Sequence, residues 1–236
     1  MGIVFLGGFK SDMTGQKALA LEDRARADGL AFLRLDYSGH GQSGGRFVDG
    51  TIGRWAADAL AVVRHAGATV PGLGGPLVLC GSSMGGWIMI LVALALARAG
   101  GAQQAGGLVG IAAAPDFTAD LLPEQLGAAG METIRRDGRL DLPSAYSDEP
   151  TTITNALVED GDRHLVLRAP IPLACPARLI HGTADPDVPW PVSQRLLDRL
   201  ASTDATLTLV KDGDHRLSTP RDLARLCDTA VELAQG

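Results

Sequence analysis

Residues 79–87 read LCGSSMGGW, and this stretch decides the fold of the chain. An apolar strand pattern runs into G-x-S-x-G centred on Ser83, and the apolar run 87–97 follows it. Between a strand and a helix, this pattern predicts a sharp turn that exposes a serine hydroxyl. The backbone passes so close to its neighbours in such a turn that small flanking residues are needed, and glycines supply them. A glycine-rich strand-to-helix turn without a chemical role is the alternative.

The rest of the chain alternates strand and helix patterns, which predicts an α/β fold with a parallel sheet and helices on both faces. We expect one domain over residues 1–236, with a mostly parallel sheet of about six strands. The expected strands are 3–6, 31–35, 77–80, 107–113, 177–180 and 206–210, and the expected helices are 14–28, 51–66 and 219–234.

The alternation stops between residues 115 and 170. This stretch holds Pro-Glu, Asp-Gly and Glu-Pro turn signals and short helical patterns, and no strand–helix unit fits it. Because it follows the strand after the Ser83 helix, we interpret residues 115–170 as a helical lid inserted over the site. An ordinary surface excursion is the alternative.

Composition narrows the classes of partner. The net charge is −6, from 27 acidic and 21 basic side chains, and no basic run suggests nucleic acid. The three cysteines lie far apart, so we expect neither a zinc site nor a redox pair, but reduced thiols in a cytosol-like, cytoplasmic setting. The longest apolar run falls short of the ~18 residues that span a bilayer. We therefore expect a protein without a membrane span.

A serine nucleophile needs a base, and the base needs a third group that fixes its tautomer. In this architecture the acid follows the penultimate strand and the base follows the last one. Asp185 and Asp187 both lie in the first of these loops, and we choose Asp185 as the acid, with Asp187 as the fallback. His215 lies in the second loop and is the predicted base. His181 ends a strand and is interpreted as a packed histidine.

An oxyanion hole needs two N–H donors. The first is predicted to be the backbone N–H of Met84, at the start of the helix after Ser83. The loop after the first strand, residues 7–10, is placed to supply the second, and Phe9 is the predicted donor.

A second glycine pattern resembles a dinucleotide-binding motif but lacks the context that the motif requires. Gly39, Gly41 and Gly44 match the G-x-G-x-x-G dinucleotide fingerprint after a strand. The fingerprint requires a helix that opens at its last glycine, and the loop continues here instead. We therefore expect no dinucleotide and no other cofactor. The loop is interpreted as a brace for the site, with Asp36 capping backbone amides.

Taken together, these motifs resemble the α/β-hydrolase superfamily, and within it the acyl-glucuronide esterase and palmitoyl-protein thioesterase group with its bacterial relatives. The segments that carry the resemblance are 15–20 (GQKALA), 36–43 (DYSGHGQS), 81–87 (GSSMGGW), 181–190 (HGTADPDVPW) and 214–216 (DHR). The resemblance implies Ser83 as nucleophile, Asp185 as acid and His215 as base. It also implies carboxylic ester or thioester substrates, small molecules or acylated proteins, including acyl glucuronides and S-acyl cysteines.

One departure from that group concerns the start of the chain. Such hydrolases usually begin with a β-hairpin, and this sequence starts almost at the strand after it. Either the start is truncated or the fold lacks two edge strands, and an uncovered edge at 31–35 would invite pairing with a second copy. Two other functions compete with a serine esterase or thioesterase. One is a peptidase or amidase that uses the same residues, and the other is a non-catalytic binding protein of the same fold.

Overall fold

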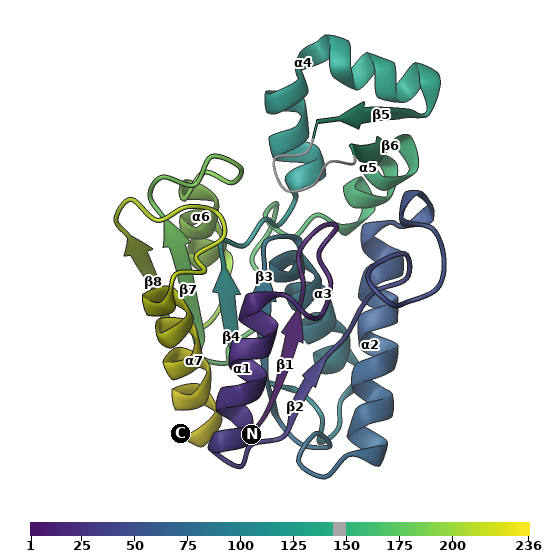
Figure 1. Ribbon diagram of the computed structural model, residues 1–236. Helices are drawn as coiled ribbons and strands as arrows, with labels where there is room; N and C mark the ends of the chain where they lie inside the picture. The colour runs from purple at the N-terminus through teal and green to yellow at the C-terminus, as the bar shows by residue number, and fades with distance from the viewer. Residues whose placement is uncertain (144–149) are drawn as a thin grey trace.

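A six-stranded sheet forms the centre of the computed structural model, which describes residues 1–143 and 150–236 (Figure 1). Its strand order is β2-β1-β3-β4-β7-β8, and every neighbouring pair is parallel. The predicted parallel sheet is thus confirmed. The strands are β1 (Gly2–Leu6), β2 (Phe32–Arg34), β3 (Leu77–Ser82), β4 (Ala105–Ile111), β7 (Ala177–Gly182) and β8 (Ala205–Val210).

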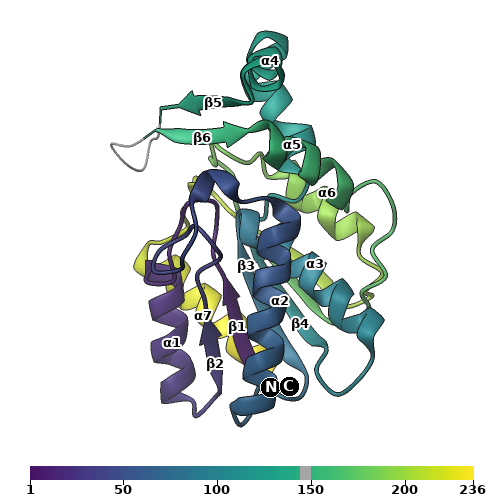
Figure 2. The same ribbon diagram turned by 90° about the vertical axis from the view of Figure 1, so that its right-hand side faces the viewer.

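Helices cover both faces of this sheet (Figure 2). On one face, α1 (Gln16–Ala27) and α7 (Pro220–Gln235) contact each other and bury Ile3, Phe5 and Cys80 of the sheet. On the other face lie α2 (Ile52–Thr69), α3 (Met84–Ala99) and α6 (Pro191–Arg199). Trp55 of α2 and Trp87 of α3 are fully buried in the apolar core on this face. The six-stranded sheet therefore has two separate apolar cores.

Residues 115–170 are here called the insertion, and its described residues, 115–143 and 150–170, lie beyond the carboxyl ends of the strands (Figures 1 and 2). The described part contains α4 (Phe117–Asp137), β5 (Arg139–Leu142), β6 (Thr151–Thr154), α5 (Asn155–Gly161) and a short 3-10 helix (Asp162–His164). The helical pieces were expected, but the antiparallel pairing of β5 with β6 was not. Each of these strands has four residues, which is too short for alternation to be distinctive.

Hydrogen bonds join the two ends of the insertion to each other and tie one of them to α3. The carboxylate of Asp116, which is fully buried, accepts the backbone N–H groups of Val166 and Leu167 at 2.8 and 2.9 Å. The indole N–H of Trp87 in α3 donates to the carbonyl of His164 at 3.0 Å. Both ends of the insertion are thus held near the helix that follows Ser83.

Two further features concern the surroundings of the chain. Among the described residues, no helix combines the length and the apolar character needed to cross a membrane. The edge strand β2 has only three residues. A strand this short offers few unpaired backbone groups to a second chain, which limits the pairing expected at that edge.

Candidate active site

Ser83 sits at the sharp turn between β3 and α3. Its backbone has φ 54° and ψ −124°, a combination that side-chain-bearing residues rarely adopt. The surrounding packing must hold this strained conformation in place. The predicted strand–turn–helix context of Ser83 is therefore confirmed.

The flanking glycines explain how the turn is held. A Cβ on Gly85 would lie 2.1 Å from the carbonyl oxygen of Leu6 and 2.5 Å from that of Gly7. A Cβ on Gly81 would lie 2.3 Å from the carbonyl oxygen of Gly85. Because the obstructing atoms are backbone, they cannot move aside cheaply. The expectation that this turn requires small residues is confirmed.

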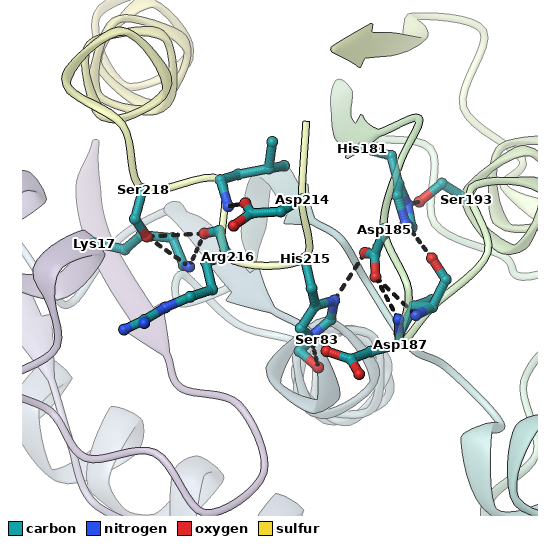
Figure 3. Close-up of polar contacts among 12 residues, drawn as sticks. Lys17, Ser83, His181, Asp185, Asp187, Ser193, Asp214, His215, Arg216 and Ser218 are labelled. Atoms are coloured by element: carbon teal, nitrogen blue, oxygen red, sulfur yellow. Dashed lines mark hydrogen bonds and ion pairs between the residues drawn. The ribbon is translucent and has the colours of Figure 1, made fainter. Parts of the chain in front are cut away.

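The three polar residues that the sequence predicted lie in one chain of hydrogen bonds (Figure 3). The Nε2 atom of His215 lies 3.0 Å from the Oγ of Ser83. The Nδ1 atom of His215 lies 2.8 Å from Oδ2 of Asp185. The Asp185 side chain is fully buried and the His215 side chain is 15% exposed. An imidazole thus bridges an alcohol and a carboxylate.

The acid loop and the base loop meet because glycines face each other at the ends of β7 and β8. A Cβ on Gly182 would lie 2.2 Å from the carbonyl oxygen of Gly213. The N–H of Ala184 donates to that same carbonyl at 3.0 Å, and the hydroxyl of Thr183 accepts the N–H of Asp212 at 2.8 Å. These bonds fix the distance between the loops that carry Asp185 and His215.

Asp185, rather than Asp187, makes the hydrogen bond to His215. Its Oδ1 accepts the backbone N–H groups of Asp187 and Val188, both at 2.9 Å. Burial by itself would raise the pKa of Asp185, but hydrogen bonds from His181 and His215 outweigh burial and hold the pKa well below its ordinary value. The carboxylate therefore stays ionised beside the imidazole.

His181 is buried as the sequence indicated, but it also contacts the acid, which the sequence did not indicate. Its Nε2 lies 3.2 Å from Oδ2 of Asp185 and 2.9 Å from the carbonyl of Val188. Its Nδ1 lies 2.6 Å from the hydroxyl of Ser193 on α6. No sequence spacing announces this contact, because it depends on how α6 packs against β7.

Lys17 of α1 holds the loop that carries His215. Its ammonium group donates to the carbonyl of Arg216 and lies 3.5 Å from the hydroxyl of Ser218 (Figure 3). Burial, followed by the positive charge of Arg216, lowers the pKa of Lys17 to about 8. The base loop is thus tied to the far side of the sheet from α6.

Phe9 and Met84, the predicted oxyanion donors, line the same cavity as Ser83. Met84 is the first residue of α3, so its N–H has no acceptor one turn earlier in the helix. Phe9 follows Gly8, and a Cβ on Gly8 would lie 3.3 Å from the Cβ of Ser83. The next N–H, that of Lys10, donates to Nε2 of the buried His40 at 3.2 Å. The loop after β1 is therefore anchored close to Ser83.

A cavity of about 900 Å³ opens beside Ser83 and reaches under the insertion. Its lining includes Ser83, Met84, Phe9 and His215. The insertion contributes an apolar wall made of Phe117, Leu121, Leu122, Leu142 and Ile153. The site therefore borders a volume that can hold an apolar group of substantial size.

A metal ion and a dinucleotide are two other ligands that residues near this site could bind. Side-chain atoms of Asp185, Asp187 and His215 lie within 4.8 Å of one another, a spacing that could hold a metal ion. The closest contact among them, however, is the hydrogen bond from His215 to Asp185 described above, so the imidazole nitrogen facing the acid is already engaged. This arrangement fits an acid–base pair better than a set of metal ligands.

The glycine loop near Asp36 opens no α-helix. The next element is a 3-10 helix at Phe47–Asp49, so the requirement for a dinucleotide site is not met. The carboxylate of Asp36 accepts the backbone N–H groups of Met13 and Gln42 at 2.7 and 2.9 Å. The predicted capping role of Asp36 is confirmed.

Comparison with known proteins identifies the family of this chain. Residues 3–162 match the family model described as serine aminopeptidase, S33. The mitochondrial palmitoyl-protein thioesterase of Bos taurus is 37% identical over 233 residues, covering 98% of this chain and 72% of the relative. The chain belongs to this α/β-hydrolase family. The predicted resemblance is therefore confirmed, and the protein is a hydrolase.

Solved structures of similar proteins have the same fold as this hydrolase. The α/β-hydrolase domain-containing protein 10 from mouse superposes with a TM-score of 0.85 at 36% identity, covering 99% of this chain and 89% of the other. A crystal structure from Agrobacterium vitis S4 superposes with a TM-score of 0.93 at 43% identity, covering 99% and 87%. The α/β-hydrolase fold thus extends over nearly the whole chain.

Proposed function

We propose that this hydrolase cleaves carboxylic esters or thioesters through a covalent acyl-enzyme formed on Ser83. The observation that carries the proposal is the hydrogen-bonded chain from Ser83 through His215 to Asp185. An alcohol becomes a useful nucleophile when a base removes its proton, and a buried carboxylate stabilises the imidazolium that results.

The proposed reaction has two steps. Ser83 Oγ attacks the acyl carbon while its proton moves to Nε2 of His215, and the carbonyl oxygen becomes an oxyanion held by the N–H groups of Phe9 and Met84. His215 then gives the proton to the departing alcohol or thiol. In the second step His215 removes a proton from water, the resulting hydroxide attacks the acyl carbon, and Ser83 leaves with the proton. The reaction as written uses no cofactor.

The insertion is proposed to act as a lid over the acyl group. Its residues Phe117, Leu121 and Ile153 line the cavity beside Ser83 and are apolar, so they favour a hydrocarbon chain over a charged group. The name of the thioesterase relatives refers to a palmitoyl-protein substrate. S-acyl and other acylated substrates, including the acyl glucuronides suggested by the resemblance, are the first compounds to test.

A peptidase or amidase is the second candidate, because the family model carries an aminopeptidase description. Both reactions would use the same three residues, so only a substrate panel separates them. Among matched ester, thioester and amide substrates with one acyl group, the ester and the thioester should be hydrolysed faster than the amide. Faster hydrolysis of the amide than of the ester would favour the peptidase.

Labelling with a fluorophosphonate tests the nucleophile directly. The wild-type protein should be labelled on Ser83, and Ser83→Ala should lose both the label and turnover of p-nitrophenyl esters. Ser82→Ala is the matched control, since Ser82 is the adjacent hydroxyl, and it should still be labelled. An unlabelled wild-type protein would favour the third candidate, a non-catalytic binding protein of this fold.

The cellular setting is a separate proposal. Cys80, Cys175 and Cys227 are free thiols, which supports a reducing, cytosol-like compartment, while the thioesterase relatives are named as mitochondrial. Fractionation of cells that produce the protein decides between these compartments. Size-exclusion chromatography with light scattering determines whether the chain is a monomer or a homo-oligomer.

A further inference from the structure

A second histidine contacts the acid of the proposed triad, and the proposed reaction gives it no role. His181 and Ser193 are both 0% exposed, and they extend the chain of hydrogen bonds beyond Asp185 (Figure 3). His181 ends β7, whereas Ser193 lies in the first turn of α6. The chain therefore runs from Ser83 to a hydroxyl on the helical layer.

The surroundings of His181 determine which of its nitrogens carries the proton. Nε2 faces two oxygen atoms, Oδ2 of Asp185 at 3.2 Å and the carbonyl of Val188 at 2.9 Å. Neither oxygen can donate when the carboxylate is ionised, so Nε2 must carry the hydrogen. In the neutral ring Nδ1 then holds a lone pair, and the hydroxyl of Ser193 at 2.6 Å donates to it. The two oxygens beside Nε2 thus set the tautomer of His181, and the Ser193 hydroxyl holds the ring in place through Nδ1.

We propose that His181 and Ser193 are positioning residues that orient the Asp185 carboxylate and limit how much of its charge acts on His215. The argument rests on the proposed function, because it assigns Asp185 the role of acid. Oδ1 of Asp185 is held by two backbone N–H groups, whereas Oδ2 is shared between His215 and His181. A side chain from β7 thus competes with the base for one carboxylate oxygen.

The competition for Oδ2 predicts the direction in which the pH dependence of the reaction changes when His181 is replaced. Removing the His181 donor leaves Oδ2 to His215 alone, so the protonated imidazole of His215 gains stabilisation. The base would then take up its proton at a higher pH and be blocked over a wider range. Asp187 is a further charged group beside this pair, since its carboxylate lies within the same 4.8 Å cluster, and it is unchanged by the substitution. The acid limb of kcat/KM should therefore move upward in pH.

Two matched pairs of variants test the proposal with the wild-type chain as reference. Ser193→Ala removes the hydroxyl and Ser193→Thr keeps it, while His181→Met removes the donor and His181→Gln keeps an N–H in its place. His181→Met should lower kcat by roughly 10- to 100-fold, the effect of one lost hydrogen bond to a charged group, and Ser193→Ala, which loses a bond between neutral groups, by roughly 2- to 10-fold. They should also raise the pH of the acid limb, whereas the threonine and glutamine variants should recover both values.

A packing role would lower the melting temperature without moving the acid limb. An unchanged kcat and acid limb in Ser193→Ala and His181→Met would overturn the proposal. If His181→Met does not fold, Ser193→Ala decides alone, since it removes a single oxygen atom.

A spectroscopic measurement separates this inference from the proposed function. Nitrogen NMR of the histidine rings should show His181 protonated at Nε2 in both the wild-type protein and Ser193→Ala, with the Nδ1 signal shifted in the variant because it has lost the hydroxyl of Ser193. Protonation at Nδ1 in the wild-type protein would overturn the inference, whatever the activity. If fluorophosphonate fails to label Ser83, the proposed function fails, and the ring spectra still report whether Ser193 donates to His181.

Discussion

Nε2 of His215 lies 3.0 Å from Oγ of Ser83, although the strands that carry them, β8 and β3, are separated in the sheet by β4 and β7. The base must therefore reach across two strands. It does so on a loop that Lys17 holds on one side and the acid loop holds on the other. The position of His215 thus depends on contacts from both faces of the sheet.

The choice between the two acids yields the first prediction. Asp185→Asn should lower kcat on the order of 10³-fold or more, because an amide can no longer hold the imidazole in the productive tautomer. Asp187→Asn should lower kcat less than about 10-fold, since its backbone rather than its carboxylate supports Asp185. Steady-state kinetics on one ester measures both. A larger loss in Asp187→Asn would reassign the acid.

The ionised state of Asp185 also makes stability depend on pH. Its pKa in the folded protein lies below that in the unfolded chain, so its contribution is present above about pH 4 and is lost as pH falls further. The difference in unfolding free energy between wild type and Asp185→Asn should therefore be larger at pH 7 than at pH 3. Urea titrations at the two pH values measure it. Asp198→Asn, at an exposed position, is the control and should show a constant difference.

The strained backbone of Ser83 predicts that replacing this residue by glycine gives a more stable protein than replacing it by alanine. Glycine adopts φ near 54° without a steric penalty, whereas alanine does not. Ser83→Gly should therefore be about 1 kcal/mol more stable than Ser83→Ala, after the greater freedom of glycine in the unfolded chain is subtracted. Thermal unfolding of the two inactive variants tests this. Equal melting temperatures would show that the turn carries no strain.

The apolar wall of the insertion predicts a change in specificity. Leu121→Trp should narrow the cavity beside Ser83 and shift the preferred acyl chain to a shorter length, with little effect on the smallest ester. Rates over a series of p-nitrophenyl esters give the comparison. Ala128→Trp adds the same bulk at an exposed position of α4 and should leave the preference unchanged. An identical shift in both variants would argue against the wall as the acyl site.

Much of the site was predictable because the order of the strands along the chain is simple. The carboxyl ends of parallel strands meet at one edge, so polar residues after β3, β7 and β8 had to converge there. That argument could not choose between Asp185 and Asp187, which share one loop. The choice depends on which carboxylate faces His215. The Asp185 carboxylate is oriented by the backbone N–H groups of Asp187 and Val188, and this contact cannot be read from the sequence.

The features that the sequence did not predict are either short elements or contacts that depend on how elements pack. The strands β5 and β6 have four residues each, and α6 has nine, so few residues carry the periodic pattern of each element. The contact from His181 to Asp185 exists only because Ser193 and the Val188 turn fix the ring. Such contacts join residues whose spacing carries no local meaning, so they follow from the assembled structure alone.

The strands that flank the insertion, β4 and β7, are direct neighbours in the sheet. The polypeptide thus leaves the sheet and returns to the adjacent position, and the insertion interrupts no strand pairing. Its length can therefore change while Ser83, Asp185 and His215 keep their relative positions. The residues that line the roof of the cavity and those that hold the three polar side chains together belong to separate parts of the chain.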